Sequence, residues 1–396
     1  MSALDHTGFR AYFLAAVPLV QALWAQRVTL GWLAWEISGS APFVGLIAAL
    51  GLAPMLISGP VFGVLVDRTD IRRALLLTSG SMALLLGLAA LLAGGPGLGP
   101  WGLSAVALAI GVVTSAHHPV RMSLGPRLVP KADVSNVVAL SALNFNLARL
   151  IAPVLTGLAL ATVGAVATLW VSAALYLPML VAIRWMDPRP LPRQAGDASI
   201  RAGIAAGLSF LAGNGVARQA MVLTGAMAVL VRGYLELLPV MAEGVQARGA
   251  EGLGFLTAAA GAGALVAALA KTGGIGAGSG VTPVTRVVLV AGIASLAALG
   301  WSESWTAALF WTAVAGFAST FCGVGLQAAV QQELPDDLRG RVMSLWVVVG
   351  IGAVAIGSGA LGWAAGGLGL PMALVMAGMA GALAAAVLSF RGPAAT

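Results

Sequence analysis

The chain has 396 residues, of which 59% are hydrophobic and only 9% are charged. A soluble protein carries charge on about a quarter of its residues, so this chain has too few polar groups to cover a surface that faces water. We therefore predict an all-α, polytopic membrane protein. The formal net charge of +7 could suggest a nucleic-acid partner, but the charges fall in loops between apolar segments, which favours membrane topology over nucleic-acid binding.

Twelve apolar segments are long enough to cross a bilayer, because a membrane-spanning helix needs about 20 mostly apolar residues. They cover residues 11–35, 43–66, 74–94, 101–120, 135–161, 165–184, 217–241, 252–271, 284–301, 304–328, 341–365 and 371–390. Glycine is abundant, with 53 residues, and small residues allow helices to approach closely in lipid. We expect the lipid bilayer to surround most of this chain.

Lysine and arginine residues orient these segments. With the N-terminus inside, all but four of the 21 Lys and Arg residues fall in inner segments. The exceptions are Arg248 in an outer loop and Arg27, Arg149 and Arg232 inside spans. Positively charged loops stay on the cytoplasmic side. We therefore predict a multi-pass protein of a bacterial inner membrane, with both termini in the cytoplasm. We also expect a monomer.

A short charged stretch begins at the end of the second span and continues into the following loop. It contains Gly63, Leu65, Asp67, Arg68, Asp70, Arg72 and Arg73. The stretch resembles the signature Gly-x-Leu-x-Asp-Arg-x-Gly-Arg-Arg of the major facilitator superfamily, with Asp70 where the signature has glycine. The resemblance implies alternating access between two six-helix halves and a conformational gate formed by Gly63, Asp67, Arg68, Arg72 and Arg73. The alternative is that this positive charge serves topology alone.

The fifth span carries small residues at the spacing of an antiporter motif. These residues are Ala139, Ala148, Ala152, Pro153, Thr156 and Gly157. Proline bends a helix and small residues let two helices touch, so we expect Pro153 and Gly157 to kink this span. The spacing favours export, although ordinary small-residue packing produces a similar pattern.

Three stretches refine the resemblance within the superfamily. Residues 26–40, 130–157 and 339–344 are similar to the bacterial branch of enterobactin-exporter-like and drug or metabolite exporters. The halves of the chain also repeat, because residues 128–140 align with residues 333–345. Such internal duplication is typical of the parallel repeats of the superfamily. We therefore predict the major facilitator fold, with twelve transmembrane helices in two six-helix pseudo-repeats.

A cytoplasmic linker at 185–216 separates the two predicted halves, 1–184 and 217–396. Its first part contains three prolines and mixed charge, which excludes a membrane span. Residues 199–214 then read as a short helix on the inner surface, with Ser199 as a candidate N-cap.

Charged side chains inside a bilayer are costly and usually face a cavity or a partner. Arg27 lies in the first span beside Gln26, and Arg149 lies in the fifth span near Asn144. The first half has no mid-span carboxylate that could neutralise the arginines. We predict that these four residues bind an anionic or electron-rich substrate. Alternatively, the arginines bond to backbone carbonyls or extend toward the membrane surface.

The seventh span contains Arg232 and Glu236, which share a helix face because they are four residues apart. Glu236 is the only carboxylate well inside a predicted span, so we predict that it carries the coupling proton while Arg232 contacts substrate. Alternatively, the two side chains pair with each other. The adjacent His117 and His118 point about 100° apart, so they do not readily bind one metal, and we expect hydrogen bonding or packing there.

No enzyme or cofactor signature occurs in the chain: it lacks a Gly-x4-Gly-Lys-Ser/Thr motif, and its glycine-rich stretch at 273–278 follows a span and not a strand. The leading interpretation is a secondary active transporter that exports a small organic compound by alternating access, driven by protons. The compound would be siderophore-like, drug-like or an anionic metabolite. Two alternatives stay open: uptake or facilitated transport of an anionic metabolite without proton coupling, and a non-transporting membrane receptor or scaffold.

Overall fold

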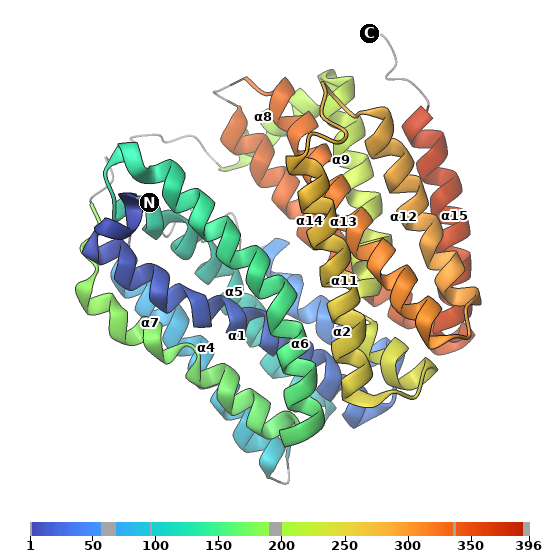
Figure 1. The fold of residues 1–396 in the computed structure, drawn as a ribbon, viewed down its shortest axis with the longest axis horizontal. Helices are drawn as coiled ribbons and strands as arrows, with labels where there is room; N and C mark the ends of the chain where they lie inside the picture. Colours follow the sequence, from blue (N-terminus) through green and yellow to red (C-terminus); the bar gives the residue numbers. More distant parts are fainter. Residues whose placement is uncertain (1, 57–68, 96, 190–199, 336–337, 391–396) are drawn as a thin grey trace. The chain divides into compact units, whose positions relative to one another are not determined.

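The computed structural model describes residues 2–56, 69–95, 97–189, 200–335 and 338–390 (Figure 1). All regular structure in these residues is helical, as predicted. Nine of the described helices are long and apolar enough to cross a membrane, or ten if one strongly bent pair is counted as a span. The all-helical class is confirmed, whereas the number twelve stays a prediction.

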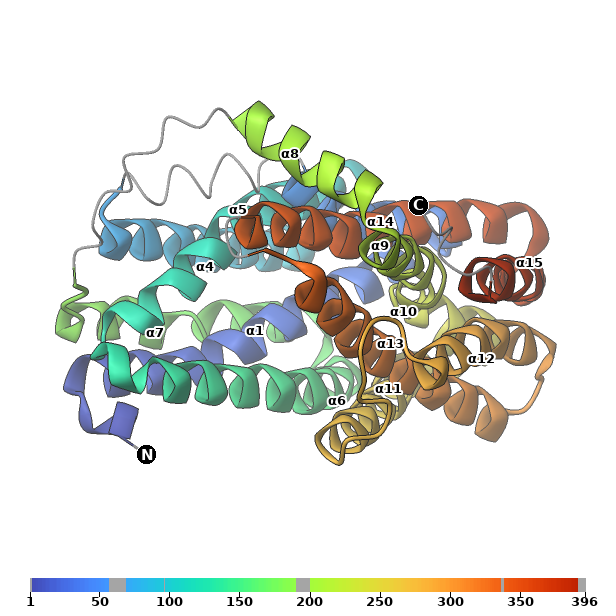
Figure 2. The ribbon, with the colours of Figure 1, turned by 90° about the horizontal axis from the view of Figure 1, so that it is seen from above.

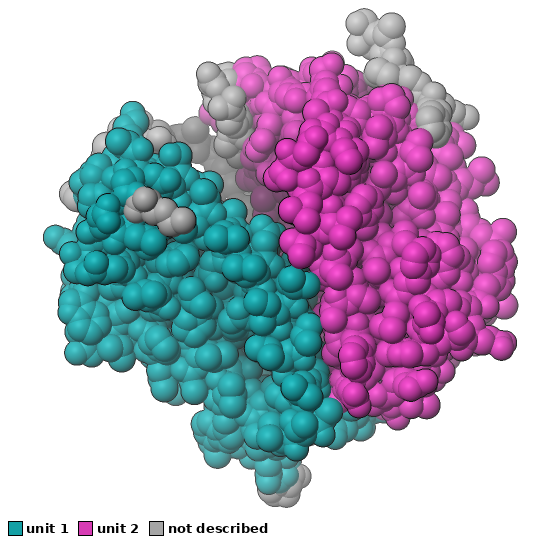
Figure 3. Space-filling model, in the orientation of Figure 1, with its two compact units in different colours: residues 1–38, 53–196 teal, residues 39–52, 197–396 magenta. Residues whose placement is uncertain are grey.

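The chain forms two compact units, shown in teal and magenta in Figure 3. Unit 1 contains residues 1–38 and 53–196, and unit 2 contains residues 39–52 and 197–396. The second apolar helix, α2 (Ala41–Leu52), thus groups with the C-terminal part of the chain. A Cβ atom on Gly45 of α2 would lie 3.2 Å from the Cα atom of Gly362. This close backbone approach explains why α2 packs with unit 2.

Unit 1 is built around the pairing of α1 and α6, which run side by side (Figure 1). Its elements are η1 (Ser2–Asp5), α1 (Thr7–Ser38), α4 (Ile71–Gly94), α5 (Pro100–Arg127), η2 (Lys131–Asp133), α6 (Val134–Ala174), α7 (Leu177–Ala182) and η3 (Ile183–Trp185). Small buried residues of α1, including Ala15, Ala16 and Ala22, line its packed face. They allow the neighbouring helices to approach closely.

The long helix α6 contains the fifth predicted span and the first part of the sixth, and its backbone departs from helical geometry at Gly164, with φ 79° and ψ 173°. A positive φ is unfavourable for residues with a Cβ atom and is readily adopted by glycine. Beyond this break, the helix packs against α4, where a Cβ atom on Gly87 would lie 3.3 Å from the ring of Trp170. Gly164 therefore separates the part of α6 that packs along α1 from the part that packs along α4.

Unit 2 contains the remaining helices. They are α2, α8 (Ile200–Gly213), α9 (Gly215–Met227), the π-helix η4 (Ala228–Arg232), α10 (Gly233–Leu235), the π-helix η5 (Val240–Val245), α11 (Gly249–Thr272), α12 (Pro283–Trp301), α13 (Trp305–Glu333), α14 (Arg339–Leu368) and α15 (Leu370–Phe390). Helices α12 and α15 lie side by side, and α11 packs on α13 (Figure 2). Close glycine contacts set the α11–α13 distance: a Cβ atom on Gly263 would lie 2.8 Å from the carbonyl carbon of Ala313.

Side-chain caps fix several helix starts. The Asp70 carboxylate accepts hydrogen bonds from the backbone N–H groups of Arg72 (2.8 Å) and Arg73 (3.4 Å) at the start of α4. Asn214 accepts from the N–H of Ala217 at the start of α9, and its amide nitrogen donates to Glu333 at the end of α13. Such caps satisfy N–H groups that have no partner within the helix.

Candidate functional site

The first part of the candidate site lies on α1. Gln21, Trp24 and Arg27 are three residues apart, so their side chains occupy adjoining positions on the helix surface. The Arg27 guanidinium carbon is 5.9 Å from the centre of the Trp24 ring, within range of a cation–π interaction. Both side chains are half-buried. In the described part of the chain, Trp24 Nε1 and Gln21 Oε1 are buried and have no hydrogen-bond partner.

Helix α6 completes this part of the site with Phe145 and Arg149, which are four residues apart and share a face. The ring centres of Phe145 and Trp24 are 5.7 Å apart, with planes inclined by 57°. Arg149 is half-buried and lies near enough to Arg27 for the two positive charges to act on each other. We call Trp24, Arg27, Phe145 and Arg149 the arginine–aromatic cluster. It joins the two arginines that the sequence analysis singled out.

The predicted ligands Gln26 and Asn144 lie next to this cluster and connect helices. Tyr176 donates a hydrogen bond to Gln26 Oε1 (3.1 Å), and the Asn144 amide donates to the carbonyl oxygen of Ala16 (3.1 Å). Gln26 is 4% exposed and Asn144 is 7% exposed. These contacts position α1 against its neighbours, and direct contact of either side chain with substrate stays a prediction.

His117 extends the polar contacts of unit 1 to two further helices. Its Nδ1 lies 3.0 Å from the Thr78 hydroxyl on α4, and its ring packs edge-on against Tyr176 at 6.4 Å. The side chain is 1% exposed. The expected hydrogen-bonding and packing role of this histidine therefore fits its surroundings. Sequence reasoning missed Thr78 and Tyr176; the signal for Tyr176 was a phenol in the middle of an apolar segment.

The other predicted site residues of the membrane interior, Arg232 and Glu236, are in unit 2. Arg232 ends a π-helical turn, a geometry often found at functional sites, and donates a hydrogen bond to the carbonyl oxygen of Gly350 on α14 (3.0 Å). Glu236 follows one turn later, and both side chains are half-buried. A Cβ atom on Gly233 would lie 2.8 Å from the carbonyl carbon of Gly357, so α10 and α14 are in backbone contact beside these two residues.

The predicted gate is only partly visible. Gly63, Asp67 and Arg68 lie outside the described residues. Arg72 and Arg73 form the first turn of α4, where Asp70 caps the helix. The aspartate that departs from the signature thus has a structural role. The gating role of the arginines stays a prediction.

The predicted kink residues Pro153 and Gly157 are both buried in α6. The dihedral angles that leave the helical region belong to Gly164, so the change of packing partner along α6 occurs about two turns after Gly157 and about three turns after Pro153. A bend at Pro153 or Gly157 stays a prediction. Within the described ranges, no group of three or more His, Cys, Asp or Glu residues could hold a metal ion.

Half-buried cations and aromatic rings inside an apolar helical bundle are typical of a membrane transporter, in which charged groups face a cavity or a partner. The family model described as "Transmembrane secretion effector" matches residues 1–394. The chain belongs to this family of the major facilitator superfamily. Its curated relatives and structural neighbours are transporters and not enzymes.

Curated relatives agree with this assignment. The chain is 29% identical to an enterobactin exporter, EntS, from Shigella boydii serotype 4 (strain Sb227) over 374 residues, which are 93% of this chain and 86% of the relative. EntS of Escherichia coli O1:K1 / APEC is also 29% identical, over 375 residues with the same coverage.

Two crystal structures show the same fold at low sequence identity. The bacterial homologue of the human lysosomal transporter Spinster, inward-facing and unoccupied, has a TM-score of 0.76, 14% identity and 96% coverage of both chains. The nucleoside transporter NupG has a TM-score of 0.73 and 13% identity, covering 96% of this chain and 99% of its own.

Proposed function

We propose that this protein is a proton-driven exporter of small organic anions that carry an aromatic ring, and that it works by alternating access. The arginine–aromatic cluster is the observation that carries the substrate class. It brings two cations and two aromatic rings together on the facing sides of α1 and α6. The relatives named as exporters support the direction of transport.

The chemistry of the cluster suits an aromatic carboxylate or phenolate. A guanidinium group can donate two parallel hydrogen bonds to a carboxylate, and a negative charge beside both Arg27 and Arg149 would relieve the repulsion between them. Trp24 and Phe145 offer ring faces and edges for stacking. Gln21 Oε1 and Trp24 Nε1, which have no hydrogen-bond partner among the described residues, add one acceptor and one donor for polar groups of the substrate.

The cost of two cations inside a bilayer supports a functional role for them. The first half supplies no carboxylate from the middle of a span, since its acidic residues are Asp5, Glu36, Asp67, Asp70 and Asp133. We propose that the negative charge of the transported compound balances the cluster during transport. Gln26 and Asn144 support the site by holding α1 in register with its neighbours.

Proton coupling is assigned to Glu236, the one carboxylate well inside a predicted span. Its location next to a π-helical turn and a glycine contact between α10 and α14 places it at a point where two helices touch through their backbones. We propose that protonation of Glu236 changes this nearby contact between α10 and α14. Arg232, held by Gly350, contributes positive charge one turn away. We further propose a monomer in a bacterial inner membrane, with both termini cytoplasmic and the arginines at the start of α4 acting as a gate.

The test of the substrate site compares variants at Arg149. Loss of a hydrogen bond to a charged group weakens binding by about 1.5–3 kcal/mol, so Arg149→Gln is expected to raise the half-saturating concentration of an aromatic carboxylate at least about tenfold. Arg149→Lys retains the charge without the planar fork, so its half-saturating concentration should lie between those of Arg149→Gln and wild type. Trp24→Leu should weaken the binding of aromatic substrates more than the binding of aliphatic carboxylates.

The matched control is Arg189→Gln, because Arg189 is exposed and belongs to neither the cluster nor the gate. Transport by this variant should equal wild type. If Arg149→Gln and Arg149→Lys both transport like the control at equal protein levels, the proposed substrate site is wrong. If transport is unaffected by an imposed pH gradient, facilitated movement of an anion replaces proton-driven export.

A further inference from the structure

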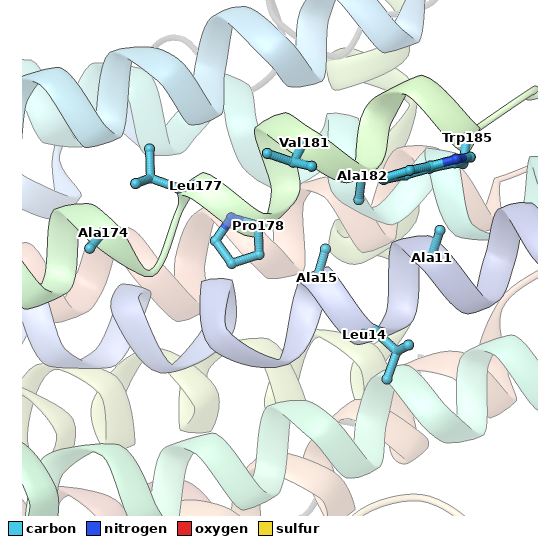
Figure 4. A pocket seen from close by; sticks show the side chains of 9 residues that line it. All are labelled: Ala11, Leu14, Ala15, Ala174, Leu177, Pro178, Val181, Ala182 and Trp185. Carbon is cyan, nitrogen blue, oxygen red and sulfur yellow. The ribbon is translucent and has the colours of Figure 1, made fainter.

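A groove lies between α1 and the α7–η3 segment of unit 1, away from the arginine–aromatic cluster (Figure 4). Its volume is about 600 Å³, and every residue that lines it is apolar. Leu14 and Ala15 form part of one wall, and Leu177, Pro178 and Val181 form part of the other. Leu14 is 64% exposed. Both walls belong to segments that are long and apolar enough to cross a membrane, and the exposed Leu14 and Leu177 side chains make this apolar surface accessible.

Two arginines flank one end of this groove. A Cβ atom on Gly8 would lie 3.4 Å from the carbonyl oxygen of Trp185, so the start of α1 meets the end of η3. Arg10 shares a helix face with Leu14, because the two are four residues apart. Arg184 stacks on the Trp185 ring at 5.0 Å, and its Nε donates to the carbonyl oxygen of Val181. Both arginine side chains are exposed.

Trp185 marks the depth of this end of the groove. It is 55% exposed and forms part of the groove wall. Tryptophan is enriched where hydrocarbon meets the headgroup region, and arginine is enriched on the cytoplasmic side. The apolar walls therefore lie at the level of acyl chains, and the Arg10 and Arg184 side chains lie at the level of phosphates.

We propose that this groove binds one anionic phospholipid, with an acyl chain along the apolar walls and the phosphate between Arg10 and Arg184. Basic residues at the membrane surface attract anionic lipids, by about a factor of five for each residue. Membrane topology alone accounts for positive charge on this side, but it does not place an open apolar groove directly beside two arginines. The site is separate from the substrate cluster, so it does not depend on the proposed function.

Lipid retention by the purified protein tests this proposal. The full chain is extracted in detergent, and bound palmitoyl-oleoyl phosphatidylglycerol is titrated by native mass spectrometry, with phosphatidylcholine as the zwitterionic comparison. Wild type should retain one phosphatidylglycerol per chain. The double variant Arg10→Gln/Arg184→Gln should bind it about 30-fold more weakly. Ala174→Trp, which fills the groove at a lining residue, should displace the lipid while leaving both arginines in place.

Matched controls separate this site from general charge and hydrophobicity. Lys131→Gln/Arg189→Gln removes the same charge from two exposed residues outside the groove, and binding should stay within about twofold of wild type. Val171→Trp adds a ring to an exposed residue one turn before Ala174, outside the groove wall, and should retain lipid. Equal loss in the control double variant would overturn the proposal. Full lipid retention by Ala174→Trp would also overturn the proposal. So would a wild-type protein that binds inorganic phosphate but shows no lipid adduct.

Discussion

The packing of α11 on α13 provides a direct test of the structure of unit 2. Gly316 on α13 faces Ala260 on α11, and a Cβ atom on Gly316 would lie 2.7 Å from both the Cα and the carbonyl carbon of Ala260. Real Cβ atoms do not approach backbone atoms this closely. Gly316→Ala therefore forces the two helices apart, because backbone atoms, unlike the end of a flexible side chain, have no other rotamer to adopt.

The size of this effect follows from two opposing terms. Inserting a methyl group into a well-packed interface lowers stability by about 1–3 kcal/mol. Replacing glycine by alanine inside a helix raises stability by about 0.5–1 kcal/mol. Gly323 lies on the same helix with no atom within 4 Å of its Cβ position, so Gly323→Ala brings only the stabilisation that alanine gives a helix. The difference in stability between the two variants therefore isolates the cost of the inserted methyl group, and we expect Gly316→Ala to be less stable than Gly323→Ala by about 1–3 kcal/mol.

The assay is reversible unfolding of the purified protein in mixed micelles by titration with sodium dodecyl sulfate, followed by tryptophan fluorescence. Gly323→Ala should unfold at or slightly above the wild-type midpoint, and Gly316→Ala should unfold clearly below it. Equal midpoints for the two alanine variants would refute the close α11–α13 contact.

Three further predictions concern unit 1. Tyr176→Phe removes the hydrogen bond to Gln26 and should lower the unfolding free energy by about 1–3 kcal/mol, because a buried acceptor loses its donor; an unchanged unfolding midpoint would contradict this. Asp70→Ala removes the cap of α4 and should lower the stability of this helix by about 1 kcal/mol, whereas Asp70→Gly should lower it by only a few tenths of a kcal/mol. Hydrogen exchange at the start of α4 measures both effects. Equal protection in the two variants would argue against the cap. Trp24→Phe should keep more affinity for aromatic anions than Trp24→Leu, and equal half-saturating concentrations in transport assays would contradict the stacking role.

The sequence predicts helices well wherever long apolar segments are bounded by charge or glycine. The expected first span, 11–35, lies within α1, and the predicted break between 161 and 165 includes Gly164, where the helical backbone is interrupted. Helix pairing is harder to foresee. The grouping of α2 with unit 2 depends on the contact of Gly45 with α14, which involves residues far apart in the sequence.

Part of the candidate site could also be predicted. Arg27 and Arg149 are identifiable because charges inside apolar segments are rare and costly. Their association with Trp24 and Phe145 was not predicted, because it depends on the rotation and register of α1 against α6. The cap formed by Asp70 could have been predicted but was not. The residue was noted only as a departure from a family signature, although an aspartate directly before a helix is a recognisable N-cap signal.

Flux into proteoliposomes tests the central proposal most directly. The protein is reconstituted, an interior-acid pH gradient is imposed, and uptake of a radiolabelled hydroxybenzoate is measured for wild type, Glu236→Gln and Arg149→Gln. We predict that wild type accumulates the anion above its external concentration, that Glu236→Gln only equilibrates it, and that Arg149→Gln shows little saturable uptake. Wild-type uptake that is not saturable, or that is the same with and without the gradient, would contradict proton-driven transport of aromatic anions.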